Sequence, residues 1–335
     1  MAFDHIRLEK GMYREAGKSF SQVLEGLDPS EQYKGTALEG TDAFQRQLKR
    51  FGIRVKGAVS DAVEKFFSTM DSAVLFPEFV ARVVRQGMEE ADLLPSIVAS
   101  VTRIEGMDYR SIGSIPTEDE LALVDVAEGA SIPTTNIRTS EKLIPLRKRG
   151  RMLVASYEAI RFQKLDLFSV MLRQMGAYIQ KMHLADAVAT LQEDAVEYTI
   201  GAGDISGTAG TLSYDALVDF WGKFYPYEMN TMLVNTGTLT KLLKLEEMKN
   251  PLAGLNFQGT GKLETPLGAH LLRTPAVSED TILALDRRCA LEMVQAGDVS
   301  VEYDKLIDRQ LERAAITSIC GFGRIYDDAA AILHI

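Results

Sequence analysis

Cysteine, tryptophan and histidine are scarce in this chain of 335 residues, which has two cysteines, one tryptophan and four histidines. Cys289 and Cys320 are too few and too isolated for a disulfide framework or a zinc site, and we expect a reducing compartment. The histidines lack the spacing of metal ligands: His5, His183, His270 and His334. The sequence therefore predicts no metal site and no cofactor.

Long apolar runs are also missing. The longest falls short of the roughly 18 residues that a membrane helix needs, so we expect no membrane partner. The first residues, MAFDHIRLEKG, are charged within four positions, which is unlike a signal peptide. A net charge of −10 argues against a sequence-wide nucleic-acid binder, which would be basic. The length suits one large domain or two ordinary ones.

Catalytic motifs fail on inspection. GAGDISG places Ser206 where a dinucleotide fingerprint requires its third glycine. GTGKL (Gly259–Leu263) resembles a phosphate-binding loop, but its lysine is followed by leucine instead of serine or threonine. The aromatic residues between 220 and 227 fit a core better than a stacking platform. One alternative stays open, a cytosolic α/β enzyme that binds a nucleotide at the Gly201–Gly210 loop.

Hydrophobic periodicity predicts a mixed chain. Residues 1–75 are expected to be mostly helical, with a helical run from Phe44 to Met70. A short helix is predicted from Phe76 to Gly87, with Pro77 in its first turn, and a strand between Ile97 and Ile112. The longest predicted helix is Leu165–Gln192, with Asp166 as its cap. Further elements are predicted at Ser213–Phe224 and Thr238–Met248 (helices), and at Thr231–Asn235, Ala269–Arg273, Ile282–Asp286, Ala290–Val294, Ala315–Ile325 and the last residues (strands).

A polar ribbon precedes the long helix. TTNIRTSEK (Thr134–Lys142) favours β-structure, yet it has one apolar residue in nine. We predict a β-hairpin from about Ser111 out and back to Arg149, whose arms reach on the order of 40–60 Å. A hairpin of that length overhangs a body of ordinary size, and an isolated hairpin is marginal in water. Its unpaired edges invite another copy of the chain, which points to self-assembly.

The same residues carry a family resemblance. EGASIPTTNIRTSEKLIPLRKRGRMLVASYEAIRFQKLDLF (Glu128–Phe168) resembles the extended-loop segment of tailed-phage major capsid proteins. These proteins have the Hong Kong 97-type fold, which encapsulins share. TMLVNTGTLTKLLKLEEMKNPLAG (Thr231–Gly254) is similar to the family's strand–helix element, and Leu306–Ile335 resembles its closing strands. The resemblance extends over roughly residues 75–335.

The resemblance implies an α+β Hong Kong 97-like capsid fold with a peripheral domain, an axial domain, an extended β-hairpin loop and an N-terminal arm. The implied division has six parts. They are 1–76 (helical extension or scaffold-like arm), 77–110 (N-arm and first strand), 111–151 (extended loop), 152–204 (peripheral domain with the spine helix), 205–290 (axial domain) and 291–335 (peripheral domain, closing strands). Whether residues 1–75 are cleaved, act as a scaffold or are retained stays open.

The implied function is a major capsid protein, which forms hexamers and pentamers of an icosahedral shell around double-stranded DNA. No catalytic, cofactor or metal residue is implied. Partners would be other copies of the chain, a portal, and scaffolding or decoration proteins. The location would be the virion, after assembly in the host bacterial cytoplasm. The alternative within the same fold is an encapsulin-type compartment that holds a cargo protein.

Charge suggests one subunit contact. Four basic residues form the basic cluster: Arg147, Lys148, Arg149 and Arg151. We hypothesise that this cluster pairs with acidic groups of a neighbouring copy, for which the candidates are Asp186, Glu193 and Asp194. The net acidity predicts weak contact with packaged DNA, since phosphate repels acidic surfaces.

Overall fold

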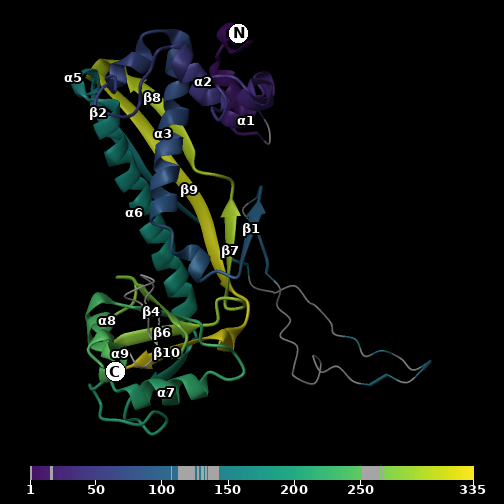
Figure 1. The fold of residues 1–335 in the computed structure, drawn as a ribbon, viewed down its shortest axis with the longest axis vertical. Helices are drawn as coiled ribbons and strands as arrows, with labels where there is room; N and C mark the ends of the chain where they lie inside the picture. Colours follow the sequence, from purple (N-terminus) through teal and green to yellow (C-terminus); the bar gives the residue numbers. More distant parts are fainter. Residues whose placement is uncertain are drawn as a thin grey trace. The chain divides into compact units, whose positions relative to one another are not determined.

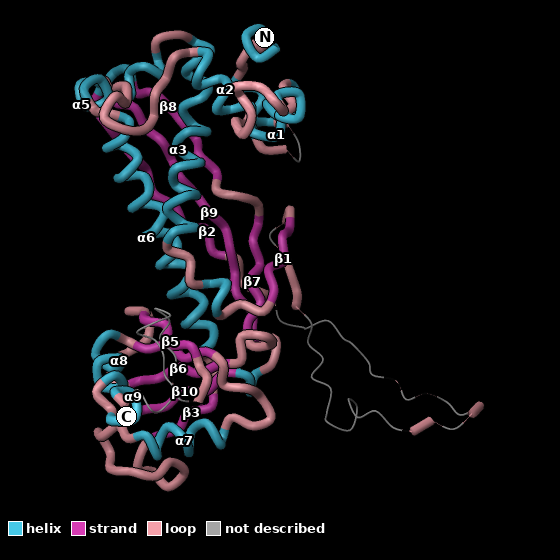
Figure 2. Tube along the Cα trace, in the orientation of Figure 1, coloured by secondary structure: helices cyan, strands magenta, loops and turns pink. Residues whose placement is uncertain are grey.

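The computed structural model describes residues 2–15, 18–106, 108–111, 125–126, 128–129, 132, 134, 143–250, 265 and 267–335. The chain divides into two compact units (Figures 1 and 2). Unit 1 comprises residues 1–92, 148–180 and 298–318, and unit 2 comprises 93–147, 181–297 and 319–335. The predicted hairpin lies largely outside the described residues.

Capping residues set where the first helices of unit 1 begin. These helices are α1 (Phe20–Leu27), α2 (Ala43–Arg50) and α3 (Met70–Glu90). Each starts with a capping box, in which the side chains of the cap and of the third helical residue bond each other's backbone N–H groups. The cap residues are Ser19, Asp42 and Thr69.

Two predictions for this region are wrong. The run Phe44–Met70 is not one helix, because α2 ends at Arg50 and the next helical turn, η4 (Val63–Phe67), is a 3₁₀ helix. Pro77 lies inside α3 rather than in a first turn, because the cap at Thr69 starts the helix earlier. A proline inside a helix costs about 3 kcal/mol, and burial of the surrounding apolar side chains offsets that cost.

The predicted longest helix is confirmed as α6 (Leu165–Gln192), and the N-terminal residues share the hydrophobic core of unit 1 with it. Leu24, Phe44 and Phe66 lie in the same buried cluster as Phe168 and Leu172. Helix α5 (Tyr157–Phe162) precedes α6, and two backbone bonds tie the junction to residues 61–63. Val63 N donates to Gln163 O at 2.9 Å, and Leu165 N donates to Asp61 O at 2.9 Å.

The predicted role of Asp166 as a helix cap is wrong. α6 already begins at Leu165, so Asp166 lies within the first helical turn. Its carboxylate accepts a bond from Gly57 N at 3.3 Å and thereby adds a further tie between the N-terminal residues and α6.

Strands complete unit 1. β8 (Ser300–Leu306) pairs antiparallel with the first half of β9 (Leu311–Arg324), in the register Ser300↔Thr317 to Leu306↔Leu311. β2 (Arg147–Ser156) lies on the other side of β9 in the strand order. Leu153 and Ala155 of β2 pack against the core of unit 1.

Unit 2 contains a sheet in the order β3-β10-β6-β4-β5. β10 is parallel to β3 and antiparallel to β6, whereas β4 is antiparallel to β6 and parallel to β5. Every residue of β4 and β6 is buried, so both faces of these two strands are covered. The strands are β3 (Val196–Thr199), β4 (Thr231–Val234), β5 (His270–Arg273), β6 (Thr281–Leu285) and β10 (Ala330–His334).

Further helices and strands of unit 2 flank this sheet in the sequence. α7 (Tyr214–Lys223), α8 (Thr236–Leu243) and α9 (Glu246–Lys249) confirm the predicted helical regions, although a break separates α8 from α9. β1 (Ser100–Ile104) pairs parallel with β7 (Leu291–Ala296), which pairs antiparallel with the last residues of β9. β1 is shorter than the predicted strand Ile97–Ile112.

A buried carboxylate holds the end of β6. Asp286 accepts bonds from Asn230 Nδ2 at 2.7 Å, Glu228 N at 3.1 Å and Arg288 Nη2 at 2.8 Å. Burial alone would raise the pKa of Asp286. The bonds from Arg288, Glu228 and Asn230 outweigh burial and lower the pKa to about 2.

This low pKa predicts acid sensitivity in unit 2. The folded-state pKa of Asp286 lies below the ordinary value of 3.8. Its ionised form therefore contributes to the free energy of unfolding above that pH, and this contribution is lost as the pH falls towards 2. We expect the free energy of unfolding to drop over that window by about 1 kcal/mol more in the parent than in Asp286→Asn, after allowing for solvent screening. Chemical unfolding at pH 2.5, 3.5 and 7 measures this difference. Identical pH slopes would refute it.

Candidate assembly surfaces

β2 presents one face outward. Its side chains alternate, so Met152 and Val154 are exposed opposite the buried face. β2 ends the order β1-β7-β9-β2, so among the strands that the structure describes it pairs with β9 alone. Gly150 permits close pairing, because a Cβ there would lie 2.8 Å from Ile316 O. An edge strand with exposed apolar side chains is suited to contact with another chain.

The basic cluster lies at the start of β2. Arg147, Lys148 and Arg151 are exposed, whereas Arg149 is half-buried. Arg147 Nη1 lies 2.9 Å from Asp186 Oδ1 of the same chain, so the structure brings one predicted basic and one predicted acidic residue together within a subunit. The arginine is largely exposed, so the pair contributes at most about 1 kcal/mol.

The other two predicted acidic residues follow the end of α6. Glu193 and Asp194 are both exposed, and Asp194 adopts a φ of 57° in the turn. The Arg324 guanidinium donates to the backbone carbonyl of Glu193, so this contact engages the backbone of Glu193 and not its carboxylate. Both carboxylates therefore lie on the surface, where a basic group of a neighbouring copy can reach them.

Helix α7 and the residues just after it expose aromatic side chains that the sequence interpretation assigned to the core. Phe220 and Phe224 are buried, as predicted, but Trp221 is 49% exposed and Tyr225 is 83% exposed. Val218 is also exposed and lies three residues before Trp221, so these two form a short exposed row on α7, whereas Tyr225 follows the helix, which ends at Lys223. Each buried phenylalanine is followed directly by an exposed aromatic residue. The sequence alone does not show which of the two positions faces the core. Contiguous exposed apolar side chains are typical of interaction surfaces.

A second exposed row lies on the part of α6 in unit 1. Phe168, Leu172 and Ile179 face the core, whereas an adjoining side of the helix exposes another apolar set. That set is Leu167, Val170, Met171 and Tyr178. A helix that is apolar on two sides has more apolar surface than its own unit covers.

The Gly201–Gly210 loop is a packed turn. Gly201 N donates to Ile205 O at 3.0 Å, and Ile200 and Ile205, both buried, form a β-bridge. Gly201 and Gly207 have positive φ values, so the glycines serve the turn. Gly259–Leu263 lies outside the described residues. Within the described part of the chain, no cluster of acidic, histidine or cysteine side chains could hold a metal, and no helix could span a membrane.

Comparison with known families gives a direct match. The family model described as phage capsid protein matches residues 139–334, which include β2, α6 and the sheet of unit 2. No curated protein sequence matches the chain.

Solved structures share the fold. The crystal structure of a virus-like particle from Pyrococcus furiosus is 14% identical in sequence. The matched region covers 77% of this chain and 98% of that chain, with a TM-score of 0.51. The capsid of a native GTA particle is 15% identical, covers 72% of this chain and 89% of its own, and has a TM-score of 0.53. A structure from Gordonia phage Cozz is 11% identical, covers 72% and 86%, and has a TM-score of 0.50. At these low identities the similarity is one of fold.

Proposed function

The chain belongs to the family of phage capsid proteins, and from this premise we propose that its copies assemble as hexamers and pentamers into an icosahedral shell around double-stranded DNA. It has the Hong Kong 97-type capsid fold and is a structural protein rather than an enzyme. The observation that carries the proposal is the family match over residues 139–334. Portal, scaffolding and decoration proteins are its proposed further partners, and the host cytoplasm is its proposed place of assembly.

The exposed rows on α6 and α7 support assembly. Each is a modest apolar surface, too small to hold two free subunits together by itself. In a closed shell, a subunit meets several neighbours at once, and every contact after the first is effectively intramolecular. Closed symmetry also covers edge strands such as β2. Many weak contacts thereby make a stable array.

Roles of the parts follow from this proposal. Residues 111–151 would lie over an adjacent subunit, and 205–290 would gather around the five- and six-fold axes. Residues 152–204 and 291–335 would form the peripheral domain, with 77–110 as the N-arm. We propose that residues 1–76 are retained in the shell, since their side chains share one core with α6 and their removal would expose it to water.

Electron microscopy of the purified full chain tests the proposed function. We expect rings, tubes or closed shells, and a reconstruction should place residues 205–290 nearest the ring axes. A protein that stays monomeric at high concentration would contradict shell assembly. Particles from infected or induced cells that contain double-stranded DNA support a phage shell, whereas particles filled with a cargo protein would support the encapsulin alternative.

The basic cluster gives a separate prediction. We expect Lys148→Glu with Arg151→Glu to raise the critical concentration for assembly about five-fold at low salt, since two exposed ion pairs together contribute about 1 kcal/mol. The effect should disappear near 1 M salt, where charges are screened within about 3 Å. Lys18→Glu with Lys34→Glu makes the same change at exposed N-terminal positions and should leave assembly unchanged. An equal shift in both double variants would reject the contact.

A further inference from the structure

Glu292 of β7 is a buried carboxylate that receives hydroxyl groups from the segment following β1. It is 6% exposed. Thr102 Oγ1 donates to Oε1 at 2.5 Å, Tyr109 OH donates to Oε1 at 2.8 Å, and Ser111 Oγ donates to Oε2 at 2.5 Å. These four residues, Thr102, Tyr109, Ser111 and Glu292, are called the Glu292 anchor below. Both carboxylate oxygens are therefore engaged.

The register of the sheet brings the members of this anchor together. Ser100 stands opposite Glu292 in the parallel pair β1–β7, so Thr102 is two positions along on the neighbouring strand. Side chains at such diagonal positions lie within reach of each other. Tyr109 and Ser111 then close over the same carboxylate from beyond the end of β1. An aliphatic side chain at position 292 could not hold three hydroxyl groups that are partly or fully buried.

The returning chain is fixed at the same place. Ile144 N donates to Tyr109 O at 3.0 Å, which joins the residues on either side of segment 112–142. Ile144 is buried, and two glycines of β9 make room for it and its neighbour. A Cβ on Gly321 would lie 2.7 Å from Pro145 O, and one on Gly323 would lie 2.5 Å from Ile144 Cδ1.

We propose that the Glu292 anchor fixes the position and direction at which segment 112–142 leaves and rejoins the body, and that Glu292 is a positioning residue for shell assembly. This inference rests on the proposed function, in which that segment lies on a neighbouring subunit. For the hairpin predicted from the sequence, whose arms reach on the order of 50 Å, a change of about 10° at its root would move its tip by about 9 Å. An arm that must meet a neighbour at side-chain precision therefore requires a root held by several bonds at once.

Glu292→Gln tests the anchor, because glutamine has nearly the same size but replaces one acceptor oxygen with a donor group. We expect a folded subunit whose amide hydrogen exchange at residues 108–111, 143, 144 and 146 is at least ten-fold faster than in the parent. We also expect at least ten-fold fewer closed shells, with open or irregular assemblies in their place. Glu302→Gln removes the same charge from an exposed position on β8 and should change neither measurement.

Single-donor variants keep the inference testable if Glu292→Gln does not fold. Tyr109→Phe and Ser111→Ala each remove one hydroxyl group, and each should accelerate exchange at both ends of the segment by a smaller factor. Normal exchange and normal shells in all three variants would overturn the anchor. A parent chain that never assembles, but whose exchange at these residues still depends on Glu292, would reject the shell function and support the anchor.

Discussion

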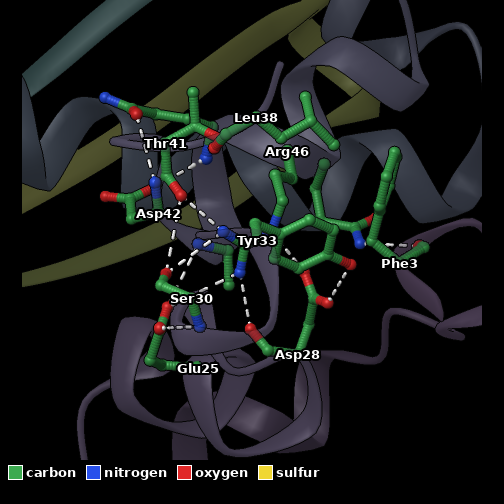
Figure 3. A network of polar contacts seen from close by, with 12 residues as sticks. Phe3, Glu25, Asp28, Ser30, Tyr33, Leu38, Thr41, Asp42 and Arg46 are labelled. Atoms are coloured by element: carbon green, nitrogen blue, oxygen red, sulfur yellow. Dashed lines mark hydrogen bonds and ion pairs between the residues drawn. The ribbon is translucent and has the colours of Figure 1, made fainter. Parts of the chain in front are cut away.

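Arg46→Met is expected to destabilise unit 1 by about 3–5 kcal/mol, because it leaves a buried carboxylate without its cation. Arg46 and Asp28 are both fully buried, and Arg46 Nε lies 2.5 Å from Asp28 Oδ2 (Figure 3). Removal of one partner of a buried pair costs more than the net stabilisation of the pair, since the remaining charge has lost its water as well.

The surrounding bonds make this pair difficult to replace. Arg46 Nη2 donates to Asp28 O at 2.5 Å, and Nη1 donates to Ser30 Oγ at 3.1 Å and to the carbonyl of Thr41 (Figure 3). Tyr33 OH donates to Asp28 Oδ1 at 2.6 Å, and the guanidinium carbon lies 4.3 Å from the centre of the Tyr33 ring. Burial and this bond to Asp28 raise the pKa of Tyr33. The network fastens α1, α2 and the turn between them.

Urea unfolding monitored by hydrogen exchange in residues 20–50 measures the loss. Arg7→Met is the matched control, because Arg7 and Glu9 form an exposed pair at 3.3 Å whose loss should cost less than 1 kcal/mol. The double variant Asp28→Leu with Arg46→Met should recover part of the stability, since it removes both charges. A loss below 1 kcal/mol in Arg46→Met would show that water reaches Asp28.

This network also bears on the N-terminal residues, whose role the sequence left open. Their equal numbers of basic and acidic residues favour neither a scaffold nor an arm. The pairing of Asp28 with Arg46 and the shared core with α6 are tertiary facts, which local patterns do not contain. The N-terminal residues are held by a buried ion pair and by a core that they share with α6, so we expect them to behave as an integral part of unit 1.

Local rules predicted the elements whose signals are local. The three- and four-residue recurrence over Leu165–Gln192 predicted α6, and continuous apolar runs predicted β4 and β6. They failed for Pro77, because an upstream cap overruled the usual position of proline. They also failed for Trp221, because periodicity shows which residues share a face and not what covers that face.

The most informative contacts join residues far apart in the chain. Thr102 and Glu292 are separated by 190 positions, and no spacing rule relates them. Likewise, nothing in the sequence around Gly87 of α3 or Gly176 of α6 indicates that each glycine packs against the backbone of the other helix. The predicted acidic partners show the same limit, since opposite charge alone did not reveal that Asp186 already pairs with Arg147 inside one chain.

Gly176→Val is expected to destabilise unit 1 by about 3 kcal/mol or more, because it forces apart two helices that touch through their backbones. α3 and α6 run side by side (Figure 1), and a Cβ on Gly176 would lie 2.0 Å from Val84 O. The reciprocal contact is as close, since a Cβ on Gly87 would lie 2.1 Å from Arg173 O. Backbone atoms cannot rotate away as side chains do, so one whole helix must shift.

Chemical unfolding of Gly176→Ala, Gly87→Ala and Gly222→Ala separates this clash from helix propensity. Gly222 is in α7, and a Cβ there would meet no atom within 4 Å, so alanine should stabilise by about 0.5–1 kcal/mol. The same substitution at Gly176 or Gly87 should destabilise. The double variant at 87 and 176 should cost less than the sum of its parts, because the first alanine already separates the helices. Additive losses would mean that the two glycines accommodate separate contacts.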